Sequence, residues 1–406
     1  MKPGSSDKSG STGLQPASIL ALAASLTLFF ASTNPAVAQA PQDPRMAPPA
    51  APAADPDLQG RLTRIDNMVN SQMTNLNIPA YNLAIIKNGQ LVFCKAYGFA
   101  DLQRRIPSSV DTVFGLASLT KTFTAITLLS LVDKGLIKLE DPLGKYIDGL
   151  TRPYQLLTIR QLASMTAGVP SKLSQEVLWK DQLEILDHTA LQSEPGSQFL
   201  YSNFSYRLLG SVISNVTGKP FLEVVEETIL APLKMSSTAT TVLLENTGRV
   251  AQGYGDNSGN GPLRPLEYKN PAISFSAGML ASTINDLINY VFGLMSRKIL
   301  SEQAYRTMWL ERPALTTGQP SKWAFGWASV TNPSFGGQRV ISMNGGTQGV
   351  ASTIIILPES NSAVIALCNL RKPPVYEIAK NAARMIFSDG SSTVTNQEEQ
   401  FEGASE

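Results

Sequence analysis

Residues 114–125 read FGLASLTKTFTA and place Ser118 three positions before Lys121. An apolar helical stretch begins after Ser118 and continues to about Leu131. Residues three apart on a helix share one face, so the hydroxyl and the amine can meet. A serine hydroxyl is a weak nucleophile until a base takes its proton, and a partly desolvated lysine can be that base because burial penalises the ammonium form. The stretch therefore indicates a reactive serine, although Ser-x-x-Lys alone is also common as an accidental pair on a solvated helix face.

Two later segments can complete such a site. Residues 201–203 read YSN, and a phenol near a lysine cation can act as a general base while Asn203 hydrogen-bonds the lysine and a substrate carbonyl. Residues 343–349 read MNGGTQG and precede an apolar run. Glycines there would let a ligand approach the backbone and expose an N–H to an oxyanion. A bulge or turn between strands explains the same glycines equally well.

A hairpin and a helix are predicted near the start of the folded part. Residues 81–101 read YNLAIIKNGQLVFCKAYGFAD, and the turn pair Asn88-Gly89 separates two apolar runs in this stretch. That pattern is typical of a β-hairpin. Apolar residues at helical spacing predict a helix over 58–75, with Asp57 as a possible N-cap.

The rest of the chain completes an α/β pattern. Residues 118–300 look mostly helical, broken by Gly and Pro loops, and a helix is predicted over 374–387. Strands are predicted at 323–331, 338–344, 351–357 and 362–369. Strands at both ends around a helical middle favour one α/β layer built from both termini, with a helical subdomain inserted.

In this order the three segments resemble the serine β-lactamase and penicillin-binding protein superfamily. The resemblance is greatest to the branch of class C β-lactamases, D-alanyl-D-alanine carboxypeptidases and related esterases. It covers most of residues 77–372 and includes ITLLSLVDKGLIKLEDPLGKYI at 126–147 and EPGSQFLYSNFSYRLLGSVISNVTG at 194–218. It implies an α/β (α+β) fold, β-lactamase/transpeptidase-like, in which an antiparallel sheet is flanked by terminal helices and a helical subdomain is inserted, with the site at their junction.

The resemblance also implies a role for each matching position. Ser118 would be the acylated nucleophile, Lys121 would accept its proton, and Tyr201 would be the acid and base partner. The backbone N–H groups of Ser118 and Gly346 would form the oxyanion hole, and Asn203 would orient Lys121 and the substrate. The expected substrate-binding residues are Asn203, Met343, Asn344, Gly345 and Gly346. This mechanism implies no metal and no cofactor.

Met343 departs from the pattern, because the family usually has Lys or His at that position. A cation there helps to attract a carboxylate, and methionine is neutral. We therefore expect a serine hydrolase with a neutral ester or amide substrate slightly ahead of a β-lactam or a peptidoglycan peptide. The alternative is a non-catalytic binding protein that uses the same cleft for a cell-wall peptide or a protein partner. An α/β-hydrolase is disfavoured, because the chain has no G-x-S-x-G.

Both ends of the chain are predicted to lie outside the hydrolase domain, which is expected over 58–388. Residues 17–31 are apolar and uncharged and precede A-x-A sequences, so 1–40 is interpreted as a signal peptide. We therefore expect a secreted or periplasmic protein whose mature chain has no membrane span. The alternative is an uncleaved signal anchor. Residues 41–57 are a Pro/Ala-rich linker, and 389–406 are expected to be disordered.

The composition excludes several other classes of protein. Hydrophobic residues make up 43% of the 406 residues, enough for a sizeable core, and the net charge of +1 gives no support for nucleic-acid binding. A single histidine, His188, disfavours a Ser-His-Asp site, and it is expected to be a surface or half-buried residue of a helix. Cys94 and Cys368 lie in strand-like runs and are interpreted as two buried free thiols, with a disulfide as the alternative in an exported protein.

Overall fold

The computed structural model describes residues 57–170, 183–186, 188–255, 261–267, 271–318, 320–347, 349–370 and 374–388. These residues all belong to one compact unit. The predicted signal peptide, the linker up to residue 56 and the tail from 389 lie outside the described residues.

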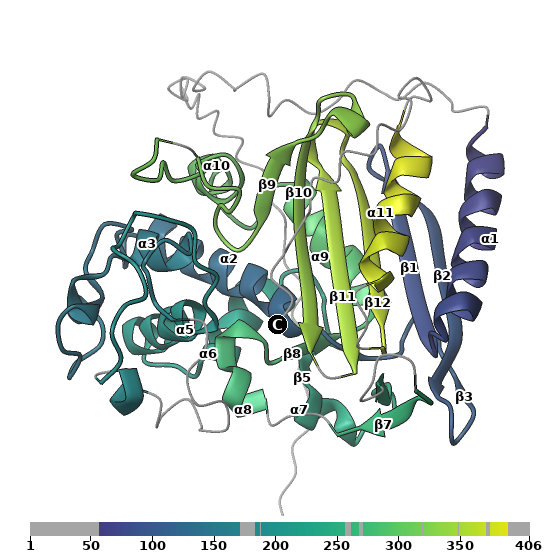
Figure 1. The fold of residues 1–406 in the computed structure, drawn as a ribbon, viewed down its shortest axis with the longest axis horizontal. Helices are drawn as coiled ribbons and strands as arrows, with labels where there is room; N and C mark the ends of the chain where they lie inside the picture. Colours follow the sequence, from purple (N-terminus) through teal and green to yellow (C-terminus); the bar gives the residue numbers. More distant parts are fainter. Residues whose placement is uncertain are drawn as a thin grey trace, which may run out of the picture. The chain divides into compact units, whose positions relative to one another are not determined.

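A seven-stranded sheet joins the two ends of the unit in the order β3-β2-β1-β12-β11-β10-β9, and every neighbouring pair is antiparallel (Figure 1). Its central contact pairs β1 with β12, from Tyr81 opposite Cys368 to Ile86 opposite Ala363. The predicted fold class is thereby confirmed. The strands are β1 (Ala80–Lys87), β2 (Gln90–Asp101), β3 (Ile106–Pro107), β9 (Ala328–Thr331), β10 (Arg339–Thr347), β11 (Val350–Leu357) and β12 (Ser362–Cys368).

The predicted hairpin between β1 and β2 is present. Asn88 and Gly89 connect the two strands with φ of 52° and 76°. Both lie in the left-handed region, which asparagine and glycine adopt most readily and which a two-residue hairpin turn requires.

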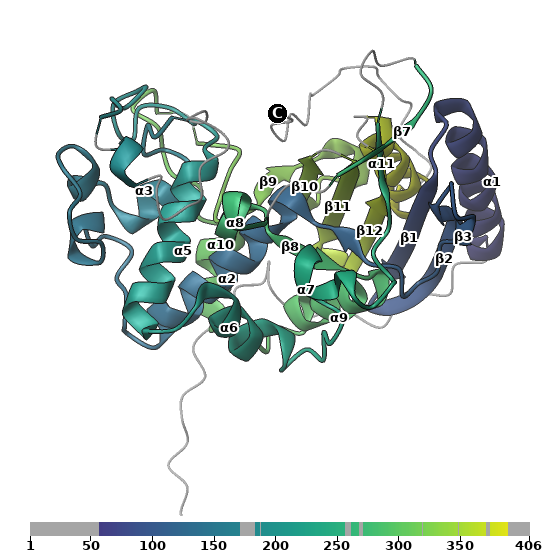
Figure 2. The ribbon, with the colours of Figure 1, turned by 90° about the horizontal axis from the view of Figure 1, so that it is seen from below.

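Helices α1 (Leu58–Leu76) and α11 (Pro374–Phe387) cover one face of the sheet, and α9 (Ile284–Met295) lies behind the other (Figures 1 and 2). Alternate residues of β1 enter different cores: Leu83 packs on the side of the two terminal helices, and Ala84 packs on the side of α9. Both faces of β1 are therefore buried. Asp57 occupies the N-cap position of α1, as expected, but its carboxylate pairs with Arg64 at 2.7 Å and makes no capping hydrogen bond.

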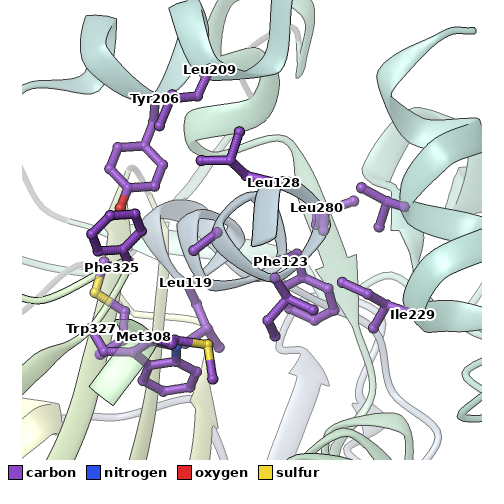
Figure 3. Close-up of a cluster of buried hydrophobic side chains, with 14 of the residues drawn as sticks. Leu119, Phe123, Leu128, Tyr206, Leu209, Ile229, Leu280, Met308, Phe325 and Trp327 are labelled. Atoms are coloured by element: carbon purple, nitrogen blue, oxygen red, sulfur yellow. The ribbon is translucent and has the colours of Figure 1, made fainter. Parts of the chain in front are cut away.

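The inserted helical part packs around α2 (Thr120–Asp133), whose residues 120–131 are all buried. A helix that is buried all round has no amphipathic stripe, so it belongs to the centre of a domain. Figure 3 shows side chains of α5 and of the 308–327 region gathered around Leu119, Phe123 and Leu128. The other helices are α3 (Ile159–Ala163), α5 (Asn203–Thr217), α6 (Phe221–Val225), α7 (Thr241–Glu245), α8 (Pro271–Ser274) and α10 (Glu302–Trp309). The short strands are β4 (Phe114–Gly115), β5 (Ala239–Thr240), β6 (Gly253–Gly255), β7 (Arg264–Leu266) and β8 (Leu280–Ser282).

The strand predicted over 323–331 begins only at Ala328. Gly326 adopts φ of 77°, outside the extended region, and a side chain there would come within 2.9 Å of the Lys121 carbonyl oxygen. The chain therefore turns beside α2 before it enters the sheet. The strand predicted over 338–344 continues to Thr347.

No helix among the described residues is long and apolar enough to cross a membrane.

Asn369 directly follows β12 and joins three other backbone segments, at the start of β1, near the end of β2 and at Gln252. Its fully buried amide accepts a hydrogen bond from the Ala80 N–H at 2.7 Å and donates to the carbonyls of Phe99 at 3.2 Å and Gln252 at 3.0 Å. Asn369→Ala leaves these groups buried without that partner. We expect the free energy of unfolding to fall by about 2–4 kcal/mol, measured by denaturant titration.

Asn285→Ala is the matched control, because Asn285 is exposed and donates to Asp111 at 2.9 Å. Its cost should stay below about 0.5 kcal/mol. Equal denaturation midpoints for the two variants would contradict this role of Asn369.

Candidate active site

Ser118 stands at an accessible point in a buried run. Among residues 112–131 every residue except Ser118 is buried. Ala117, just before it, adopts φ of 46°, a left-handed conformation that is strained for a residue with a side chain. Two hydrogen bonds to Leu280 hold this turn, one on each side. The Leu116 N–H donates to the Leu280 carbonyl oxygen at 2.8 Å, and the Leu280 N–H donates to Thr120 Oγ1 at 3.2 Å. The turn presents the Ser118 hydroxyl at the start of α2.

Two side chains converge on that hydroxyl. Lys121 Nζ lies 2.9 Å from Ser118 Oγ, and the Tyr201 hydroxyl lies 2.8 Å from it. Lys121 is fully buried although it is a lysine, and Tyr201 is half-buried. The structure thus brings together the nucleophile, the amine and the phenol that were named from the sequence.

The Lys121 amine is held by oxygen atoms from three parts of the chain. Besides Ser118, its neighbours are Asn203 Oδ1 at 2.7 Å and the Ala277 carbonyl oxygen at 2.9 Å. Three acceptors match the three donors of an ammonium group. A neutral amine in the same place would donate to two of them and turn a lone pair toward Ser118. The site can therefore hold Lys121 in either protonation state, as a proton acceptor needs.

The Y-S-N segment acquires its geometry from the start of α5. Ser202 is the N-cap, and its buried hydroxyl accepts from the Ser205 N–H at 3.2 Å. Tyr201 precedes this cap and Asn203 is the first helical residue. Asn203 accepts from Lys121 Nζ, and the Tyr201 ring centroid lies 4.9 Å from the same nitrogen. The ring of Trp323 meets that of Tyr201 edge-on, with centroids 5.9 Å apart, and its indole N–H donates to the Ala163 carbonyl at 3.2 Å. The phenol is thus packed as well as hydrogen-bonded.

The glycine-rich segment forms the end of β10 beside Ser118. Strand β9 pairs with residues Arg339 to Ser342 of β10, and beyond Ser342 this outer edge of β10 has no strand partner among the described residues. A side chain at Gly345 would overlap the Leu116 carbonyl oxygen and come within 2.9 Å of the Leu119 N–H. A glycine is therefore required for β10 to lie against the Ser118 turn. This approach brings the end of β10 against residues 117–119, directly before α2.

Comparison with known proteins agrees with this geometry. A family model described as Beta-lactamase matches residues 65–387. The chain belongs to the beta-lactamase family. Among curated relatives, Protein flp of Staphylococcus aureus (strain NCTC 8325 / PS 47) is 26% identical over 358 residues, which cover 83% of this chain and 70% of flp. Penicillin-binding protein 4* of Bacillus subtilis is 26% identical over 324 residues, 74% of this chain and 71% of that protein.

Solved structures of the superfamily have the same fold. The octameric penicillin-binding protein homologue from Pyrococcus abyssi has a TM-score of 0.71 at 25% identity and covers 80% of this chain and 77% of that chain. The β-lactamase/D-alanine carboxypeptidase from Pseudomonas syringae has a TM-score of 0.70 at 19% identity, over 82% of this chain and all of that chain, and shows the fold alone. The predicted membership of the serine β-lactamase and penicillin-binding protein superfamily is thus confirmed, and the fold supports serine hydrolase-type chemistry.

Of two expected substrate-binding side chains on β10 of this beta-lactamase-family structure, one faces away from Ser118 and the other is buried. Asn344 faces the side of the sheet covered by α11, where its amide oxygen accepts from Thr353 and it lines a small cavity with Lys380 and Arg384. Met343 faces the side of Ser118, but only 4% of it is exposed, and it belongs to the hydrophobic core. Neighbouring residues of a strand point to opposite faces, so only one of the two could face the site.

One contact of the site was missed by the sequence analysis. The Ala277 carbonyl holds Lys121, but a backbone oxygen carries no residue-type signal. The sequence pointed to this region only through the run AGMLASTINDL at 277–287, which is typical of the superfamily and begins at Ala277.

The remaining polar candidates stay apart from Ser118. Cys94 and Cys368 are free, and they pack in the cores on opposite faces of the sheet, which prevents their pairing. Burial raises the pKa of the Cys368 thiol to about 12. Within the described ranges no group of three or more His, Cys, Asp or Glu residues could hold a metal ion.

Proposed function

We propose that this protein is a serine hydrolase that forms an acyl-enzyme on Ser118. The observation that carries the proposal is the position of the Ser118 hydroxyl, 2.9 Å from a buried lysine amine and 2.8 Å from a tyrosine hydroxyl. A serine is activated when a base lies within hydrogen-bond reach of its hydroxyl and a third group orients that base. Here Asn203 is that third group.

In acylation, Ser118 Oγ forms a bond to the substrate carbonyl carbon while its proton passes to the neutral Lys121 amine. The resulting oxyanion is stabilised by the N–H groups of Ser118 and Gly346. The carbon–leaving-group bond then breaks, and the leaving group takes a proton through Tyr201, which is replenished from the Lys121 ammonium. In deacylation, water adds to the ester carbon, loses its proton to the same pair, and releases the acid as Ser118 regains its proton.

Neutral esters or amides are the proposed substrates, ahead of β-lactams and peptide carboxylates. The end of β10 has the sequence MNGGT, without a cation. A charged hydrogen bond to a carboxylate is worth about 1.5–3 kcal/mol, which corresponds to roughly 10–100-fold in rate when it acts in the transition state. Substrates whose carboxylate would bind a cation at the end of β10 lose that contact in this protein.

Rates on a p-nitrophenyl ester and on a chromogenic cephalosporin test this preference. We expect kcat/KM to be at least about tenfold higher for the ester. Faster turnover of the cephalosporin would reverse the preference but keep the hydrolase. Turnover of neither substrate, together with an unreactive Ser118, would favour the non-catalytic binding protein.

We also propose that the protein is exported, with the hydrolase domain over 58–388. The support is the uncharged apolar run at 17–31 followed by small residues. Cell fractionation with a C-terminal tag tests it, and recovery of the full-length chain from the cytoplasm alone would contradict it.

A further inference from the structure

Tyr376 reaches the active-site strand from the far side of the sheet. It lies in the first turn of α11, and its hydroxyl donates to the Gly345 carbonyl oxygen at 2.8 Å. The ring packs in the core between the sheet and the terminal helices. Burial raises the pKa of this phenol, so the hydroxyl keeps its proton and acts as a donor at neutral pH.

The bonded oxygen belongs to the peptide unit that also carries the Gly346 N–H. A peptide unit is planar and trans, so its C=O and N–H point in opposite directions. A donor fixed on the oxygen therefore fixes the direction of the N–H at the other end. It also polarises the unit, which makes the N–H a better donor.

The bond from Tyr376 adds to the support that this peptide receives from the sheet. Strand β11 pairs with Gly345 and Gly346 on one edge of β10, whereas beyond Ser342 the other edge has no partner strand among the described residues. A side chain at Gly346 would overlap the Tyr376 hydroxyl. The second glycine of the motif thus makes room for this tyrosine, while Gly345 makes room for the Ser118 turn.

We propose that Tyr376 is a positioning residue that aims the Gly346 N–H into the oxyanion hole. This inference rests on the proposed function, because it concerns the same acyl-transfer step. Tyr376 touches no reacting atom and acts through one peptide unit. Its removal should weaken binding of the tetrahedral state more than binding of the substrate.

The test is Tyr376→Phe, which deletes the hydroxyl and keeps the ring. Loss of a whole oxyanion donor costs about 10²–10³ in kcat, so a misaimed donor should cost about tenfold. KM for the p-nitrophenyl ester should change less than about twofold, and affinity for an arylboronic acid, which forms a tetrahedral adduct on the serine, should fall with kcat. Titration of active sites with a fluorophosphonate normalises the rates for any unfolded fraction.

Tyr97→Phe is the matched control. Tyr97 lies on the same face of the sheet, and its hydroxyl bonds a terminal helix through Asp66 at 2.6 Å without touching β10. It should keep kcat and boronate affinity within about twofold. Equal losses in both variants, or wild-type values in Tyr376→Phe, would overturn the positioning role while the hydrolase stands. A wild-type protein that neither turns over the ester nor labels at Ser118 would overturn the proposed function, and this inference with it.

Discussion

Ser118→Ala should lower kcat/KM for a p-nitrophenyl ester by about 10⁴-fold or more. The substitution removes the atom that forms the acyl bond, and every other residue within 112–131 is buried. Lys121 and Tyr201 would remain, but an amine and a phenol without the serine cannot form this acyl-enzyme. Steady-state rates on one ester, with the background rate subtracted, measure the effect.

Ser130→Ala is the control on the same helix. Ser130 is buried near the end of α2, and its hydroxyl donates to the Thr127 carbonyl at 3.0 Å. Its kcat/KM should stay within about twofold of the wild type. If Ser118→Ala kept a tenth or more of the activity, the nucleophile would have to be another residue.

Lys121→Met should lower kcat by about 10³-fold, within the range that general acid–base catalysis contributes. Methionine has nearly the same length but cannot take the serine proton. The variant also leaves Asn203 Oδ1 and the Ala277 oxygen without the donor that now lies 2.7 and 2.9 Å away. Pre-steady-state acylation rates separate the loss of the proton acceptor from any change in substrate binding.

Lys134→Met is the corresponding control, because Lys134 caps the exposed end of α2. Its acylation rate should match that of the wild type. Acylation by Lys121→Met at more than about a tenth of the wild-type rate would show that Tyr201 alone accepts the proton.

The positions of Ser118, Lys121 and Tyr201 could be anticipated because each has a residue type that suits its role. The apolar runs around Asn88-Gly89 predicted the hairpin, since a turn with two left-handed residues limits the choices to few sequences. The order of strands and helices then predicted a sheet built from both ends of the chain.

Other features depend on geometry that residue type does not reveal. Met343 and Asn344 are neighbours in a strand, so they must face opposite sides, but only the pairing of β10 shows which side meets Ser118. The alternating rings at 323–327 have strand periodicity, yet Gly326 bends that segment against α2. The Ala277 carbonyl has no side-chain signal, and Tyr376 comes from a helix at the other end of the chain.

Intact-protein mass spectrometry after incubation with a fluorophosphonate tests the central claim most directly, because the probe bonds to an activated serine. The wild type should gain one adduct per molecule, which peptide mapping should locate at Ser118, and Ser118→Ala should gain none. An unmodified wild type, or equal labelling of Ser118→Ala, would contradict the account.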